Sequence, residues 1–351
     1  SVSGSGGTGP KVDTPPGGGY PNRRRFDWGP MKTTPFFRVL TLSCLLAAVP
    51  AARADYKQAV AFYNQGQFTK AIQELKPDLD RSPEWEFGHR LLGLCYLGLG
   101  NNALAVSSFS RAAELQSTAF ATYYGLGQAY FNMRKYGDSV TALGRAETLA
   151  AREKNPEGEK TKVYRLRGAA HYRLKRFDAA AADLERALRA GSGDWADRSM
   201  LGVSYLNTNR ADDAIAELER ALALKPGEPT VREALGKAHF QKGVASLRRK
   251  EYAAAAQALG KAREYDPRNG YLHYNLAEAY LFQNRYAEAE RALGEAAALL
   301  PDNAGVHARL GLVYEKQKKW DPALKAYRKA DSLAASEELK EAIARVTENK
   351  K

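Results

Sequence analysis

The strongest constraint on the fold is an internal repeat with a period of about 34 residues, the length of a helical hairpin repeat. The repeat runs from about Asp55 to about Ala335, and small residues at one phase mark its copies. A unit of this length cannot bury enough apolar surface alone. We therefore predict that eight units stack end to end around a continuous core. The aligned small residues are Ala71, Ala105, Ser139, Ala180, Ala214, Ala255, Ala289 and Ala323.

The apolar pattern within each unit predicts two helices. In the second unit, Leu92, Gly93 and Tyr96 stand at i, i+1 and i+4, on one face of a helix with 3.6 residues per turn. Ala105 and Phe109, also four residues apart, form the matching face of a second helix. Prolines at the ends of several second helices set the turns between units. No segment has the alternating pattern of a strand, so the sequence predicts an all-α fold.

These units resemble the tetratricopeptide repeat. The resemblance rests on the period and on a Leu-Gly pair followed by an aromatic residue, as in RLLGLCYLGLGNNALAVSSFSRAAEL and its copy SMLGVSYLNTNRADDAIAELERALALKP. It covers about residues 55–335 and implies a right-handed superhelical solenoid of eight helix-turn-helix repeats. Residues 336–351 follow as a predicted capping helix and tail, with Leu339, Ile343 and Val346 on one stripe.

Two of the intervals between aligned small residues exceed the period by seven residues, which is close to two helical turns. The first extra segment, around residues 151–160, contains Pro156 and Gly158, so we predict a longer loop there. The second lies near residues 244–250, where we predict a first helix longer by about two turns. Either Gly236 or Gly243 fits as the glycine of that helix, so the register of the sixth unit stays open.

Residues 31–54 have the pattern of a secretory signal peptide. Basic residues precede an uncharged, largely apolar run from Val39 to Val49, and small residues precede a predicted cleavage site after Ala54. The run has about half the length of a membrane-spanning helix, so we favour a periplasmic or secreted product over a retained membrane helix. The run also continues past Cys44, so we do not expect lipid anchoring there. We predict that residues 1–30, rich in Gly and Pro, are a disordered extension.

Few residues have the spacing of a catalytic or metal site. The sequence has no CxxC, HExxH or GxxxxGK[ST] motif. His89, His273 and His307 share one phase of the repeat, so we interpret them as packing residues. Cys95 lies within the apolar face of a helix and is interpreted as a buried thiol. We therefore predict no catalytic residues, no metal and no cofactor.

The net charge of +13 is partly concentrated in two places, residues 1–54 and residues 152–176. The second stretch has nine bases against three acids. Such a run is either a solvated face or a patch that attracts an acidic partner, a phospholipid surface or an anionic polysaccharide. Nucleic acid is not expected as a partner of an exported chain.

The resemblance also predicts where a ligand binds. In similar arrays the first helices line the concave side, and four phases around the glycine point into the groove. In the first four units these phases combine aromatic side chains with bases, a composition typical of recognition surfaces, although curvature could instead bury some rings. The candidate groove residues are Tyr56, Tyr63, Phe87, Arg90, Leu94, Leu97, Tyr124, Gln128, Phe131, Lys162, Arg165 and Tyr172.

The resemblance implies a scaffold that acts by binding and is not an enzyme. We expect an adaptor of the cell envelope that holds peptide or helical segments of partner proteins in its groove. The alternative is a component of exopolysaccharide export or assembly that binds an anionic glycan. Repeat proteins that clamp a chaperone's C-terminal carboxylate have Asn just after the glycine, where this chain has Leu94 and Gln128, so that function is not expected.

Overall fold

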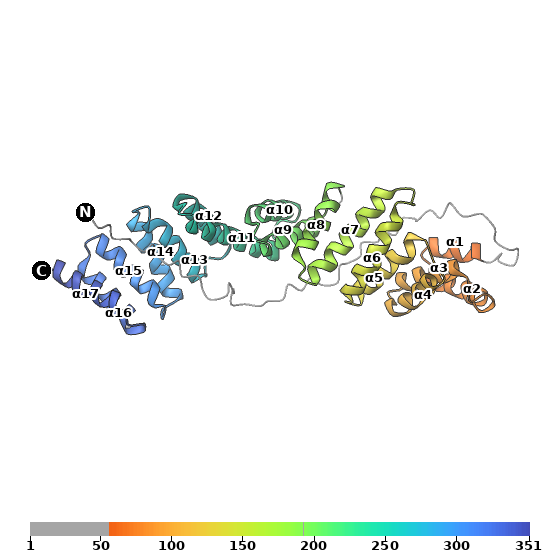
Figure 1. The fold of residues 1–351 in the computed structure, drawn as a ribbon, viewed down its shortest axis with the longest axis horizontal. Coiled ribbons are helices and arrows are strands. Elements are labelled where there is room, and N and C mark those ends of the chain that lie inside the picture. The colour runs from red at the N-terminus through yellow and green to blue at the C-terminus, as the bar shows by residue number, and fades with distance from the viewer. Residues whose placement is uncertain (1–55, 192) are drawn as a thin grey trace, which may run out of the picture. The chain divides into compact units, whose positions relative to one another are not determined.

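The computed structural model describes residues 56–191 and 193–351, so the predicted extension and signal peptide lie outside the described residues. The described residues form α-helices joined by short turns, with no strand among them (Figure 1). They separate into two compact units, which meet between Gly227 and Glu228 in the sequence. The N-terminal unit contains α1 (Tyr56–Asn64), α2 (Phe68–Arg81), α3 (Glu86–Gly98), α4 (Asn102–Glu114), α5 (Phe120–Asn132), α6 (Tyr136–Ala150), α7 (Pro156–Arg173), α8 (Phe177–Arg189), α9 (Trp195–Asn207) and α10 (Ala211–Leu224).

The C-terminal unit continues the same alternation of helices. Each odd-numbered helix up to α15 packs against the helix that follows it, and each even-numbered helix packs against the next helix in its own unit. Its helices are α11 (Pro229–Arg248), α12 (Tyr252–Tyr265), α13 (Gly270–Leu281), α14 (Tyr286–Leu299), α15 (Ala304–Lys316), α16 (Trp320–Leu333) and α17 (Glu337–Asn349).

The turn inside each helix pair contains one residue in the left-handed region. Only two of these residues are glycines, and the others are Arg, Lys or Asn with φ near +60°. Each turn lets the chain reverse within a few residues so that the two helices pack. The left-handed residues recur with the spacing of the aligned small residues: Gly66, Gly100, Arg134, Lys175, Asn209, Lys250, Asn284 and Lys318.

Close packing of the paired helices decides the register of the sixth pair. A Cβ atom added to Gly202 of α9 would lie 2.6 Å from the Cγ of Leu218, so only glycine allows that helix crossing. A Cβ atom added to Gly243 would lie 2.5 Å from the Cγ of Leu259, and this glycine and leucine have the same separation in sequence as Gly202 and Leu218. Gly243 therefore has the register of the crossing glycine, whereas Gly236 approaches the end of α12, where an added Cβ atom would lie 2.9 Å from the Cβ of Tyr265.

The structure confirms one of the two predicted insertions and corrects the other. As predicted, the extra residues of the sixth pair lengthen its first helix, because α11 has 20 residues and α9 has 13. The longer loop predicted around residues 151–160 is wrong, because α7 begins at Pro156 and has 18 residues. Pro156 fits the first helical turn, where its missing N–H would have no helical partner. The side chain of Asn155 caps the helix by accepting a hydrogen bond from the Gly158 N–H at 3.1 Å.

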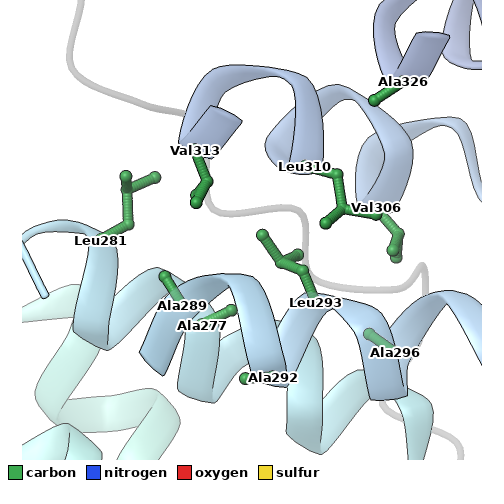
Figure 2. Packing of buried hydrophobic residues seen from close by; sticks show 10 residues of the cluster. All are labelled: Ala277, Leu281, Ala289, Ala292, Leu293, Ala296, Val306, Leu310, Val313 and Ala326. Carbon is green, nitrogen blue, oxygen red and sulfur yellow. The ribbon is translucent and has the colours of Figure 1, made fainter. Parts of the chain in front are cut away.

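Aliphatic side chains from consecutive helices form the core of the C-terminal unit. Leu293 of α14 lies among Val306, Leu310 and Val313 of α15, beside alanines that let the helices approach (Figure 2). The predicted C-terminal helix is present as α17, which packs on α16. Its buried Val346 is fully covered. Among the described helices, none has both the length and the apolar character needed to cross a bilayer.

Candidate functional site

The first helices of the pairs lie beside one another. In the N-terminal unit, α1 contacts α3, α3 contacts α5, α5 contacts α7 and α7 contacts α9, and in the C-terminal unit α11 contacts α13. We call the side formed by these first helices the inner face of each unit. Because neighbouring first helices lie side by side, residues at one phase form a row across them.

Aromatic rings of α1 and α3 form one cluster at the start of the N-terminal inner face. The ring of Tyr56 meets the ring of Phe87 edge to face, with centroids 5.9 Å apart. Trp85, at the N-terminus of α3, lies 6.2 Å from Tyr56 and 5.7 Å from Phe87. The structure therefore brings together two predicted groove residues, and both remain partly exposed. The prediction did not include Trp85, whose ring is buried beneath them.

Three other predicted groove rings lean back onto their own helix pair. Tyr172 is only 8% exposed, so its prediction as a groove residue is wrong: its ring fills the turn between α7 and α8. Tyr63 is more accessible, but burial raises the pKa of its hydroxyl to about 12. Each ring contacts the first residue of the following helix, at centroid distances of 5.8, 5.4 and 6.0 Å for Tyr63 with Phe68, Phe131 with Tyr136, and Tyr172 with Phe177.

The remaining uncharged candidates are partly buried. Tyr124 stacks on Phe120 at 5.3 Å, and burial beside the Glu159 carboxylate raises the pKa of Tyr124 to about 12. Leu94 and Leu97 pack against the core formed around α4 and α5. Gln128 is also partly buried. These side chains are therefore mostly packed into the inner face and do not project from it.

The predicted bases of the inner face are ion-paired. Arg90 lies 3.1 Å from Glu86 on the preceding turn of α3 and also over the Phe87 ring at 4.9 Å. Lys162 lies 2.7 Å from Glu159 on α7. An acid one turn away thus neutralises each base, and neither adds unbalanced positive charge to the inner face.

Arg165 connects two neighbouring first helices. Its guanidinium lies 2.6 Å from a carboxylate oxygen of Asp197 on α9 and 3.2 Å from Asp194, which also caps α9. Asp197 is only 2% exposed, and this burial raises its pKa to about 6. Arg165 therefore holds α7 to α9, and its charge is compensated by two acids of the next pair.

The basic stretch at residues 152–176 includes an arginine that connects α7 with its neighbours. The Arg167 guanidinium donates two hydrogen bonds to Asp183 at 2.7 and 2.8 Å, and a third to Glu147 at 2.6 Å. Glu147 also accepts a hydrogen bond from the Tyr164 hydroxyl at 2.9 Å. Arg165 and Arg167 thus serve ion pairs between helices, and Lys160 and Lys162 form ion pairs within α7, which weakens the interpretation of this stretch as a patch for anions. The bases of this stretch that form ion pairs include Lys160, Lys162, Arg165 and Arg167.

The most exposed aromatic residues of the described chain lie on α13 and at its end. The predicted groove residues cover only the first four units and do not include them. Tyr271 is 37% exposed and Phe282 is 38% exposed. Phe282 stacks on Tyr252 of α12 at a centroid distance of 4.8 Å. Tyr271 stands six residues before Ala277, at a phase that the rule for groove residues includes. Applying that rule to the later units would have found it.

The histidines and the cysteine have the structural roles that the sequence predicts. The Nε2 atoms of His89, His273 and His307 each lie 2.8 Å from the carbonyl oxygen of a proline six residues earlier, which fixes the turn between pairs. Cys95 is fully buried, and burial raises its pKa to about 12, so it is an inert thiol. No cluster of three metal-ligating side chains occurs within residues 56–191 and 193–351.

The stacked helix pairs define an all-α solenoid of the helical-repeat class. Profiles described as tetratricopeptide repeat match residues 53–76, 124–194, 171–242, 246–297 and 274–338. The chain belongs to the tetratricopeptide repeat family. Repeats of this family generally serve as non-catalytic interaction modules, and the chain is a scaffold for protein–protein interaction.

Several solved structures are similar to this chain. MamA of AMB-1 is 28% identical, with a TM-score of 0.39 over 51% of this chain and 96% of that chain. The C-terminal part of a repeat protein from Cytophaga hutchinsonii is 13% identical, with a TM-score of 0.44 over 82% of this chain and 99% of that chain. The first tetratricopeptide repeat domain of Spaghetti, bound to an HSP90 peptide, is 23% identical, with a TM-score of 0.32 over 33% and 93% of the two chains. No curated protein matches the sequence.

Proposed function

We propose that the inner faces bind peptide or helical segments of partner proteins. The observation that carries this proposal is the exposure of Tyr271, which stands at a groove phase of α13, together with the exposed ring of Phe282 at the end of the same helix. Large rigid aromatic side chains give a binding surface much contact area at a small cost in conformational entropy. A surface of this kind suits apolar side chains presented at helical or extended spacing.

The charges of the inner face favour an uncharged or apolar ligand segment over an anionic glycan. Arg90, Lys162 and Arg165 each have a carboxylate partner within 3.1 Å. Binding a polyanion there would require these ion pairs to break, and a charge-compensated surface attracts polyanions weakly. The charges of the inner face therefore favour a protein segment as the ligand over an anionic glycan.

We also propose that the scaffold works in the cell envelope, on the strength of the signal-peptide pattern in residues 31–54. N-terminal sequencing of the protein purified from its native cells, combined with fractionation, tests this proposal. We expect a mature chain that begins at Asp55 in the periplasmic or extracellular fraction. An unprocessed chain in the cytosol would contradict it.

The groove proposal is tested by replacing the exposed rings. A partner captured by crosslinking from envelope extract is purified, and its affinity is measured for wild type and for the double variant Tyr271→Ala, Phe282→Ala. We expect affinity to fall at least about tenfold, because an aromatic anchor contributes about 1–2 kcal/mol or more. Tyr63 and Phe131 are poorer targets, because both lean on their own helix pair.

Leu224→Ala is the matched control. Leu224 is 58% exposed, lies at the end of the second helix α10, and is outside both inner faces. Its replacement removes a similarly exposed apolar side chain and should leave affinity unchanged. Equal losses in Leu224→Ala and the double variant, or none in the double variant at wild-type helicity, would move the ligand away from the inner face.

A further inference from the structure

The inner face of the C-terminal unit has a hollow near its last helix. A cavity of about 360 Å³ is lined mainly by residues of α15 and α17, which both pack on α16. Gly305, Ala308 and Leu312 line it from α15, and Leu339 and Ala342 line it from α17. The three residues of α15 stand at groove phases, so the cavity opens on the inner face. We call this cavity the end hollow.

The end hollow exists because α15 has small residues where other first helices have rings. Six residues before the crossing position, α3 has Phe87 and α13 has Tyr271, but α15 has Gly305. Three residues before it, α13 has Tyr274 and α15 has Ala308. The rings that α13 places at these two phases are therefore missing from α15, and the chain leaves their space unfilled.

The polar side chains of the walls already have partners. Arg309 lies 2.8 Å from a carboxylate oxygen of Glu278. The Tyr327 hydroxyl donates a hydrogen bond to Glu315 at 2.8 Å. The Ser336 hydroxyl caps α17. A polar group that entered the end hollow would lose its hydrogen bonds to water without replacing them, whereas an apolar group gains by leaving water.

The rim of the end hollow has an excess of negative charge. Glu338 lies there, is exposed, and forms no ion pair in the described chain. The bases of α17 are held by other acids. Lys340 lies 2.8 Å from Glu337. Arg345 lies 2.7 Å from Glu315. The charge of Glu338 is thus left to attract a basic side chain of a ligand.

We propose that the end hollow receives one aromatic side chain of the partner segment, with a Lys or Arg of the same segment beside Glu338. The ring fills the space that α15 leaves open and continues the row of groove residues to which Tyr271 belongs. A buried aromatic anchor in an apolar pocket is the usual centre of a binding interface. This inference rests on the proposed function, because it names the residue by which the partner segment is held.

Peptides selected from a displayed random library against the whole protein are the probes. We expect the selected peptides to share an aromatic residue with a Lys or Arg within about one helical turn of it. Their affinity should fall about tenfold or more in Ala308→Leu, because the leucine side chain occupies the end hollow. Ala344→Leu is the matched control, since Ala344 is exposed on α17 and lies outside the hollow. It should bind the peptides as wild type does.

A double-mutant cycle locates the ring of the peptide. Replacing this ring by Ala should weaken binding to wild type about tenfold, but should hardly change binding to Ala308→Leu, in which the hollow is already filled. Equal losses in the two proteins would place the ring elsewhere and overturn the proposal. If Ala308→Leu melts below wild type, Gly305→Leu fills the same hollow from the preceding turn of α15 and takes its place in the cycle.

A pair of acids tests the charge at the rim. Glu338→Gln should lower peptide affinity about two- to fivefold at low salt and have no effect at high salt, because exposed ion pairs are weak and screened. Glu337→Gln is the matched control. Both acids are in the first turn of α17, so both changes affect that helix similarly, but Glu337 lies outside the end hollow. Equal losses in the two variants would contradict a contact with Glu338.

The exposed rings of α13 separate this proposal from the proposed function. Peptides that lose affinity in the double variant Tyr271→Ala, Phe282→Ala, but bind Ala308→Leu as they bind wild type, would overturn the proposal for the end hollow and leave binding on the inner face intact. Peptides that bind all these variants equally, or a library that yields no binder, would contradict both proposals.

Discussion

At the residue scale, glycines in the helices have two different roles. Gly127 of α5 lies where two helices cross, and an added Cβ atom would lie 2.5 Å from the Cγ of Leu143. Gly144 of α6 faces open space, with no atom within 4 Å of an added Cβ. The sequence alone identifies Gly127 as a crossing glycine only because it shares the phase of the other crossing glycines.

Alanine substitutions should therefore have opposite effects at these two positions. We expect Gly127→Ala to destabilise the chain by about 1–3 kcal/mol, because the new methyl group overpacks the crossing. We expect Gly144→Ala to stabilise it by roughly 0.5–1 kcal/mol, because alanine loses less backbone entropy in a helix. Urea unfolding monitored by circular dichroism measures both, and a loss of stability in Gly144→Ala would refute the assignment of open space.

Asp197 should make stability depend on pH. Its pKa is about 6 in the folded chain and about 3.9 when unfolded, so the folded state takes up the proton first as pH falls. The contribution of this carboxyl to stability therefore grows as pH falls from 7 to 4, by about 2 kcal/mol. The contributions of the other titratable groups to the free energy of unfolding cancel when wild type is compared with Asp197→Asn at each pH.

The measurement is urea unfolding of both proteins at pH 7 and pH 4.5. We expect the stability of wild type relative to Asp197→Asn to increase at the lower pH. The opposite change would mean that the Arg165 guanidinium outweighs burial and lowers the pKa of Asp197.

At the element scale, the two longest first helices show what the repeat pattern can and cannot predict. The lengthening of α11 was predictable because its extra residues preserve the apolar phase. The lengthening of α7 was missed because Pro156 and Gly158 suggest a loop. Pro156 instead begins the helix, and its place there depends on the Asn155 cap, which the spacing of the repeats does not reveal.

The helix α17 should stabilise the end of the C-terminal unit through its apolar stripe. Val346 is fully buried against α16, so Val346→Ala should destabilise this unit by about 2 kcal/mol through lost burial and the resulting cavity. Glu341→Ala, on the exposed side of the same helix, should change stability by less than about 0.5 kcal/mol. Hydrogen exchange of α15 and α16 amides reports the loss locally. Equal effects of the two substitutions would show that α17 does not act through its buried stripe.

At the scale of the whole molecule, the fold was more predictable than the binding surface. Each unit repeats the same local pattern, so its period, helix pairs and crossing glycines are visible in the sequence. Whether a surface base is ion-paired depends on contacts between neighbouring helix pairs. Arg165 of α7, for example, forms an ion pair with Asp197 on the first helix of the next helix pair. Tyr172 similarly has the phase of a groove residue and yet is buried. A phase rule places a side chain on a helix, but it does not show which neighbours cover or neutralise it.

We expect the inner faces of the molecule to contact the partner protein. Site-specific photo-crosslinking in native cells tests it most directly, with a benzoyl-phenylalanine replacing one residue at a time. The inner positions are Phe87 and Tyr271, and the outer positions are Leu224 and Arg328. We predict that the inner positions form a covalent adduct with a partner protein and the outer positions do not. Adducts from the outer positions alone would show that the partner does not bind the inner faces.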